Sequence, residues 1–340
     1  MAALNSVSIC PVALAVGTHN WETTPESEAF QNGVLDAMKL HNVTHLDTAR
    51  AYGMGASETA IGKKGLSPDF KITTKAPTAP GNGAGSRGNV LKAARASLAD
   101  LKVEKVSVYL LHGPDETVPV AETYSAIQTL YEEGRFVEFG LSNMTKDQVL
   151  EYYNHATTNN LVLPTVFQSA YSPVSRHNET LLFPTLRELG IRIQAYSPLA
   201  MGFLAKSPSD FESETKGLSG RWDAGTINGE VHMFMFGKPS FIAMLADWCA
   251  LAEESGAGKV GLAYRWVRYH SALRGELGDE MIIGASSARQ FEEAMREIEK
   301  GPLEQWVAER IEGMWDSVRQ DAEVDSQRAL RVVIMGEGKK

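Results

Sequence analysis

The chain has 340 residues, of which 33 are basic and 42 acidic, so its formal charge is −9. Hydrophobic residues make up 43% and charged residues 22%, a balance typical of globular proteins that excludes disordered and fibrous chains. The negative charge argues against a nucleic-acid partner, because binding phosphates requires a surplus of Lys and Arg on one face.

Eight short apolar runs rich in strand-forming residues follow one another along the chain. They predict strands at residues 12–17, 44–47, 71–75, 106–111, 137–141, 165–169, 191–196 and 281–284. Amphipathic stretches predict helices in the first six intervals, at residues 27–40, 56–64, 89–101, 119–133, 145–157 and 178–189.

The interval before the eighth strand differs from the others. Residues 200–239 are rich in Gly, Ser and Pro and show little periodicity, which predicts a long functional loop. Helices are then predicted at 240–255, 259–269, 288–300 and 303–319, and the tail, 320–340, shows no clear pattern.

Strict alternation of strands and helices predicts a parallel sheet covered by helices on its faces. Eight such units favour a closed (β/α)8 TIM barrel, and an open doubly wound sheet is the alternative. No linker divides the chain, so we expect one domain over residues 1–340, with a core at about 12–319.

Only two cysteines occur, Cys10 and Cys249, and neither belongs to a Cys/His cluster. We therefore expect no disulfide scaffold and no metal site. No run approaches the roughly 18 apolar residues of a membrane span, and the first residues lack the basic segment of a signal peptide. These features favour a cytoplasmic protein without membrane contacts.

Polar residues stand at the carboxyl ends of the predicted strands, which a barrel brings to one face. They are Asp47, Lys75, His112, Ser142, Asn143, Gln168, Tyr196, Ser197, Ser286 and Ser287, and Tyr52 follows Asp47 by five positions. Taken singly, such an Asp is more often a helix cap, and such a Lys or His a surface or structural residue.

Four of these residues form a plausible proton-donating site. A tyrosine hydroxyl has a pKa near 10 and is a poor acid unless a nearby ammonium lowers that pKa. Lys75 could supply the ammonium, Asp47 could hold the lysine, and His112 could orient a carbonyl oxygen beside Tyr52. The group suits carbonyl reduction, for which a cofactor must supply the hydride.

Residues 45–58, His-Leu-Asp-Thr-Ala-Arg-Ala-Tyr-Gly-Met-Gly-Ala-Ser-Glu, resemble the signature of the aldo-keto reductase family. Further family blocks follow in order at 74–75, 110–112, 140–143, 167–168, 195–199 and 283–287. The stretches 134–143, 163–166, 182–186 and 301–303 resemble the aflatoxin-aldehyde reductase branch of that family.

The resemblance implies an NADPH-dependent reductase of aldehydes or ketones, with Tyr52 as general acid supported by Asp47, Lys75 and His112. Its implied substrate contacts are Tyr52, His112, His19, Trp21 and Arg221. Its implied cofactor contacts are Asp47, Ser142, Asn143, Gln168, Tyr196, Ser197, Pro198, Leu199, Gly202, Lys206, Arg221, Gly284, Ser286, Ser287, Arg289, Gln290 and Glu293. It also implies a homodimer, since that branch often forms dimers.

Two other interpretations remain open. Residues 83–88 fit the GxGxxG pattern of dinucleotide-binding loops, but they lie eight residues after Lys75 and not in a tight turn directly after a strand, so a plain loop is the simpler interpretation. The same fold also serves some relatives as a cofactor-bound regulatory subunit with little turnover. The intact set of four residues favours the enzyme.

Overall fold

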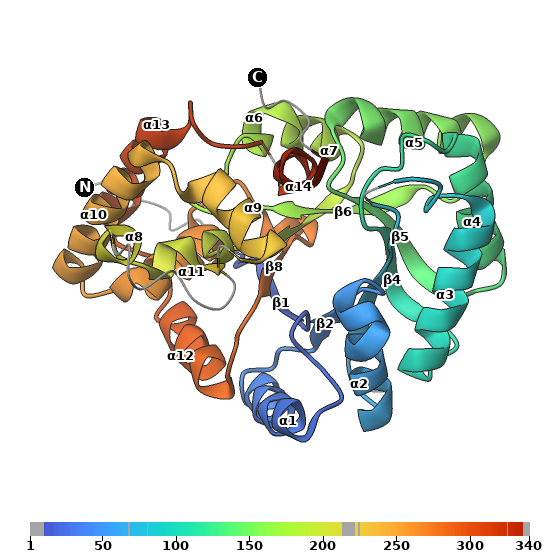
Figure 1. Ribbon diagram of the computed structural model, residues 1–340, viewed down its shortest axis with the longest axis horizontal. Coiled ribbons are helices and arrows are strands. Elements are labelled where there is room, and N and C mark those ends of the chain that lie inside the picture. Colours follow the sequence, from blue (N-terminus) through green and yellow to red (C-terminus); the bar gives the residue numbers. More distant parts are fainter. Residues whose placement is uncertain are drawn as a thin grey trace, which may run out of the picture.

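A closed eight-stranded parallel barrel forms the centre of the protein, in the order β1-β2-β3-β4-β5-β6-β7-β8, with β8 pairing back to β1. The computed structural model describes residues 10–66, 69–79, 81–212, 222–223, 225–324 and 326–335. The strands lie in the middle and helices surround them (Figure 1). This confirms the (β/α)8 barrel and excludes the open doubly wound sheet.

The strands match their predicted positions to within about a residue at most ends. They are β1 Ala13–Gly17, β2 His45–Asp47, β3 Lys71–Ala76, β4 Val106–Leu111, β5 Phe136–Ser142, β6 Pro164–Ala170, β7 Arg192–Tyr196 and β8 Glu280–Ile283. The helices among the first seven strands are α1 Pro25–Leu40, η1 Tyr52–Gly55, α2 Ala56–Lys64, α3 Arg87–Leu101, α4 Val120–Glu132, α5 Lys146–Asn159, α6 Asn178–Leu181 and α7 Phe183–Glu188.

Later helices complete the outer layer. They are η2 Ala200–Ala205, α8 Ser209–Glu212, α9 Ile227–Phe236, α10 Pro239–Glu254, α11 Gly258–Tyr269, η4 Gly275–Leu277, α12 Ala288–Glu299, α13 Gln305–Val318 and α14 Ser326–Met335. None of the helices in the described part of the chain is both long and apolar enough to cross a membrane.

Two sequence predictions between residues 178 and 239 are corrected by the structure. The single helix at 178–189 is two helices, because Pro184 supplies no N–H for a continuous helix. The loop at 200–239 contains η2, α8 and α9. Helix α9 showed no periodicity because it is apolar on most of its surface, as buried helices are.

The tail prediction is wrong for residues 326–335, which form α14. This helix packs against α9, and Ala329 is fully buried between the tail and the body of the protein. Lys238 Nζ, which donates to Glu323 Oε1 at 2.8 Å, ties the preceding residues to the start of α10. A helix of ten residues owes its stability to such packing more than to its own sequence.

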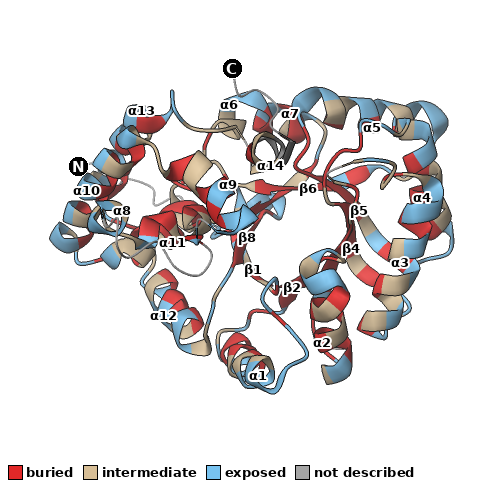
Figure 2. Ribbon diagram, viewed as in Figure 1, coloured by how far each residue is buried: buried red, intermediate tan, exposed pale blue. Residues whose placement is uncertain are grey.

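Side chains alternate along each strand between the barrel interior and the helix layer. Outward residues such as Leu46, Tyr109 and Phe167 belong to the main hydrophobic core, and Figure 2 shows the buried strands and the buried inner sides of the helices. Inside the barrel, Val108, Leu110 and Val166 form a separate small apolar cluster near β4 and β6. The remaining interior is largely polar, and this polar interior carries the site.

Candidate active site

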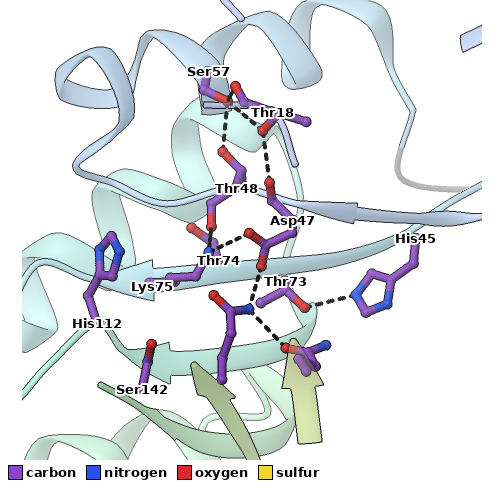
Figure 3. A network of polar contacts seen from close by, with 12 residues as sticks. Thr18, His45, Asp47, Thr48, Ser57, Thr73, Thr74, Lys75, His112 and Ser142 are labelled. Atoms are coloured by element: carbon purple, nitrogen blue, oxygen red, sulfur yellow. Dashed lines mark hydrogen bonds and ion pairs between the residues drawn. The ribbon is translucent and has the colours of Figure 1, made fainter. Parts of the chain in front are cut away.

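Lys75 and Asp47 form a buried ion pair at the carboxyl ends of β3 and β2. Lys75 Nζ lies 2.7 Å from Asp47 Oδ2 and donates a second hydrogen bond to the carbonyl of Thr48, also at 2.7 Å. Figure 3 shows the two side chains pointing toward one another, with His112 and Ser142 nearby. Burial lowers the pKa of Lys75, against the opposing charges of Asp47 and Glu58. The ammonium is thus less stable than in water.

Tyr52 lies over this pair. Its ring centroid is 5.1 Å from Lys75 Nζ, 5.8 Å from the ring of His112 in an edge-on arrangement, and 4.8 Å from the ring of His19. The structure therefore brings together the four residues predicted to be catalytic and, beside them, His19, which is predicted as a substrate contact. In general, an ammonium near a phenol hydroxyl favours the ionised form of that hydroxyl.

A tight turn presents Tyr52 to the site. η1 begins at Tyr52, and Gly55 has a φ of +96°, which favours glycine. A Cβ at Gly55 would lie 2.5 Å from Arg50 Nη1, so a larger residue would also displace that guanidinium. Arg50 in turn pairs with the fully buried Glu58 at 3.0 Å and with Asp100. The turn is fixed by these contacts.

His112 is held as a neutral imidazole. Burial of the ring, followed by the charges of Lys75 and His19, lowers its pKa from 6.5 to about 3. At neutral pH the ring can therefore donate its one N–H to a carbonyl oxygen, but it lacks the second, acidic proton of an imidazolium. Of the two rings, the Tyr52 phenol is the one whose hydroxyl could serve as an acid.

The depressed pKa of His112 should make stability depend on pH. Between about pH 6.5 and pH 3 the unfolded chain binds a proton at this residue that the folded protein does not. Its contribution is therefore complete above about pH 6.5 and is lost as the pH falls. We expect His112→Asn to flatten the fall in the free energy of unfolding between about pH 7 and pH 5, measured by urea denaturation. An unchanged fall would contradict the assignment.

Gln168, at the end of β6, joins the group through Asp47. Its Nε2 donates to Asp47 Oδ1 at 2.8 Å and to Gln194 Oε1 at 3.0 Å. Both hydrogens of the Gln168 amide are therefore donated to other side chains of the protein.

Asn143 and Tyr196 form a second group at the mouth. Asn143 has a φ of +55°, and its Nδ2 donates to the carbonyl of His112 at 2.9 Å and to Ser142 Oγ at 3.0 Å. The hydroxyl of Tyr196 donates to Asn143 Oδ1 at 2.8 Å and lies 2.8 Å from Ser326 Oγ of α14. The predicted residues at the carboxyl ends of β4, β5 and β7 are thus connected, and the tail helix contacts the site.

The segment after β7 has an unusual backbone. Ser197, Ala200 and Met201 all have positive φ values, at 57°, 49° and 57°, and Gly202 follows at 90°. Left-handed conformations at non-glycine residues cost energy and are concentrated at functional sites. Pro198, Leu199 and Lys206 lie on the same segment, which Lys259 braces by donating to the carbonyl of Lys206 at 2.9 Å.

The predicted adenosine-side residues gather at the N-terminus of α12, beyond Gly284. Ser287 caps the helix by accepting from the backbone N–H of Gln290, and the Gln290 side chain accepts from the N–H of Ser286 at 3.1 Å. Arg289 is 87% exposed and pairs with Glu293 at 2.7 Å. A helix N-terminus with a nearby arginine suits a phosphate.

For two predicted substrate contacts, the described residues show no contact with Tyr52. Trp21 belongs to the hydrophobic core and is only 2% exposed. Arg221 lies outside the described residues. The glycine pattern at 83–88 does not act as a phosphate loop among the described contacts, because the N–H of Gly85 donates to Asp115 Oδ2 at 2.8 Å.

The sequence interpretation missed a polar group below the site: Gln194 of β7, with Glu280 and His45 at the first positions of β8 and β2. The signal was available. Gln194 precedes Tyr196 by two residues, and His45 precedes Asp47 by two, so each shares the inward direction of a predicted site residue.

Comparisons with known proteins identify the family of the chain. The model of the aldo/keto reductase family matches residues 13–316. The oxidoreductase sirO of Leptosphaeria maculans is 44% identical over 288 residues, covering 85% of this chain and 86% of that protein. Human aflatoxin B1 aldehyde reductase member 4 is 38% identical over 283 residues, covering 80% and 84%. A glycerol dehydrogenase from Gluconobacter oxydans shares the fold, with a TM-score of 0.68 at 18% identity over 91% of each chain.

Proposed function

The chain belongs to the aldo/keto reductase family of oxidoreductases, and from that premise we propose that it reduces an aldehyde or ketone to the alcohol with NADPH. The observation that carries the proposal is the position of the Tyr52 ring, 5.1 Å from the buried ammonium of Lys75 and 5.8 Å from the ring of His112.

Each of the four residues has a separate role in this proposal. Tyr52 donates the proton to the carbonyl oxygen, and Lys75 stabilises the phenolate that remains. Asp47 holds the ammonium in place through the 2.7 Å ion pair. His112, with a pKa lowered to about 3 by burial, stays neutral and orients the carbonyl oxygen toward Tyr52. NADPH supplies the hydride when bound.

The chemistry of the mouth fits a nicotinamide cofactor. Ser142, Asn143 and Gln168 offer hydroxyl and amide groups suited to a carboxamide, and Tyr196 offers an aromatic ring on which the nicotinamide could stack. The left-handed segment from Ser197 to Lys206 offers a braced loop for the pyrophosphate. The N-terminus of α12 suits the 2′-phosphate, which would make the enzyme prefer NADPH over NADH.

That cofactor preference can be tested at Arg289. We expect Arg289→Ala to weaken NADPH binding about tenfold while leaving NADH binding unchanged, since only NADPH carries the 2′-phosphate. The measurement is the Kd of each cofactor by calorimetry. Arg296→Ala is a matched control, because Arg296 forms the same exposed i,i+4 pair, with Glu292, two turns further along α12. Equal losses for both variants would refute a specific phosphate contact.

The function itself is tested with purified protein, NADPH and a panel of reactive aromatic and aliphatic aldehydes. We expect the absorbance of the reduced nicotinamide to fall only when an aldehyde is present. NADPH binding without turnover across the panel would instead support a regulatory subunit.

A further inference from the structure

A chain of hydrogen bonds runs inside the barrel from the ion pair to the opposite end of the strands. Asp47 Oδ1 accepts from Gln168 Nε2, and Gln194 Oε1 accepts from the same nitrogen at 3.0 Å. Gln194 Nε2 then donates to Glu280 Oε2 at 2.7 Å. Gln194 is fully buried. It has no direct contact with a reacting atom in the proposed mechanism.

Glu280 ends this series of hydrogen bonds, and its carboxyl group is ionised. Burial alone would raise its pKa, but hydrogen bonds from His45 and Gln194 and the charge of Arg192 hold the pKa at about 2. The contacts are short: His45 Nδ1 lies 2.8 Å from Oε1, and Arg192 Nη1 lies 2.8 Å from Oε2. Figure 3 shows His45, bonded to Thr73, on the side of Asp47 away from His112.

The two carboxylates fix the direction of both amides. An ionised carboxylate only accepts hydrogen bonds, so the amide atom that faces it must be the NH2 group. Glu280 therefore turns the NH2 of Gln194 toward itself and leaves Gln194 Oε1 facing Gln168. Asp47 and Gln194 then both require the NH2 of Gln168. The one group of Gln168 left over is its carbonyl oxygen, which can only accept.

We propose that Gln194, oriented by Glu280, is a positioning residue that sets Gln168 as an obligatory acceptor for the carboxamide NH2 of the cofactor. The inference rests on the proposed function. It predicts which end of the carboxamide faces β6, and hence which face of the nicotinamide ring is turned toward Tyr52. Ser142, whose hydroxyl accepts from Asn143 and can still donate, suits the carboxamide oxygen at the other end.

The test compares NADPH with its reduced 3-acetylpyridine analogue, in which a methyl group replaces the carboxamide NH2. We expect the wild-type protein to bind the analogue about five- to tenfold more weakly than NADPH, the effect of one lost hydrogen bond. In Gln194→Met, which removes both amide contacts of Gln194 at similar volume, Asp47 is the one acceptor of this group left for the NH2 of Gln168, so the direction of the Gln168 carbonyl oxygen is less restricted. The analogue-to-NADPH ratio of Kd values, measured by calorimetry, should fall toward one.

Two further variants separate positioning from general stability. Ser169→Ala is the matched control, because Ser169 is the neighbour of Gln168 and its buried hydroxyl has no hydrogen-bond partner among the described residues. It should keep the wild-type ratio. The double variant Gln194→Glu with Glu280→Gln exchanges the carboxylate and the amide, so Gln168 still faces two acceptors. It should keep the ratio within about threefold of wild type, in contrast to Gln194→Met.

Each outcome has one meaning. A Gln194→Met protein that loses affinity for both cofactors equally, so that the ratio keeps its wild-type value, would show a merely structural role and overturn the inference. Equal binding of both cofactors by wild type would show that Gln168 does not accept from the carboxamide, which also overturns it. Failure of wild type to bind NADPH at all would instead overturn the proposed function.

Discussion

Tyr52→Phe is expected to lower the rate of aldehyde reduction by about a hundredfold to ten-thousandfold, the range measured for loss of a positioned general acid. The ring that lies 5.1 Å from Lys75 Nζ and 5.8 Å from His112 is retained, and only the hydroxyl is removed. NADPH binding should therefore stay within about twofold of wild type, since the lost interaction belongs to the transition state.

Single-turnover kinetics with saturating NADPH separate the chemical step from cofactor release. Tyr131→Phe is a suitable control, because Tyr131 is 45% exposed on α4 and belongs to the outer helix layer. Full activity in Tyr52→Phe would mean that another group donates the proton. His112 could not fill that role at neutral pH, since burial lowers its pKa to about 3.

The second large effect is expected for Lys75→Met. Removing one partner of a buried ion pair leaves the other as an uncompensated charge, at a cost of about 3–5 kcal/mol in the free energy of unfolding. Lys75 is fully buried and Asp47 is only 3% exposed, so this pair meets that condition. Carbonyl reduction should also fall by at least about a hundredfold, because Tyr52 loses its neighbouring ammonium.

Chemical denaturation measures the free energy of unfolding of Lys75→Met. Two further variants test whether the loss comes from the ion pair. Lys71→Met changes an exposed lysine at the start of the same strand and should alter stability by less than about 0.5 kcal/mol. Asp47→Leu combined with Lys75→Met removes both charges and should recover part of the loss. Wild-type stability in Lys75→Met would rule out an energetic role for the pair.

The barrel could be predicted from sequence because its signal is local and repeated. Each strand, such as Val106–Leu111, is an apolar run short enough to be distinguished from a helix, and eight of them alternate with amphipathic stretches. The barrel then predicts that Asp47, Lys75 and Gln168 lie close together, since parallel strands bring their carboxyl ends to one face.

What could not be predicted depends on contacts between distant residues. Helix α14 is stabilised by packing on α9, almost a hundred residues earlier, and α9 is mostly apolar. Residues 227–236 lack the amphipathic pattern of a surface helix, and residues 326–335 carry one but are too few to predict a stable helix on their own. Gln194 and Glu280 were missed for a different reason: they lie below the mouth, where barrel interiors are usually filled with branched apolar residues.

The hydrogen bond between Ser326 and Tyr196 couples two processes that are usually treated separately. A molecule that binds more tightly when the Tyr196 hydroxyl is held by the tail also holds the tail in place, by the same free energy. Docking of α14 then raises the affinity for the cofactor, and cofactor binding strengthens the docking of α14 to the same extent. Limited proteolysis of the tail, measured with and without NADPH, would therefore report on the cofactor site from the outside of the molecule.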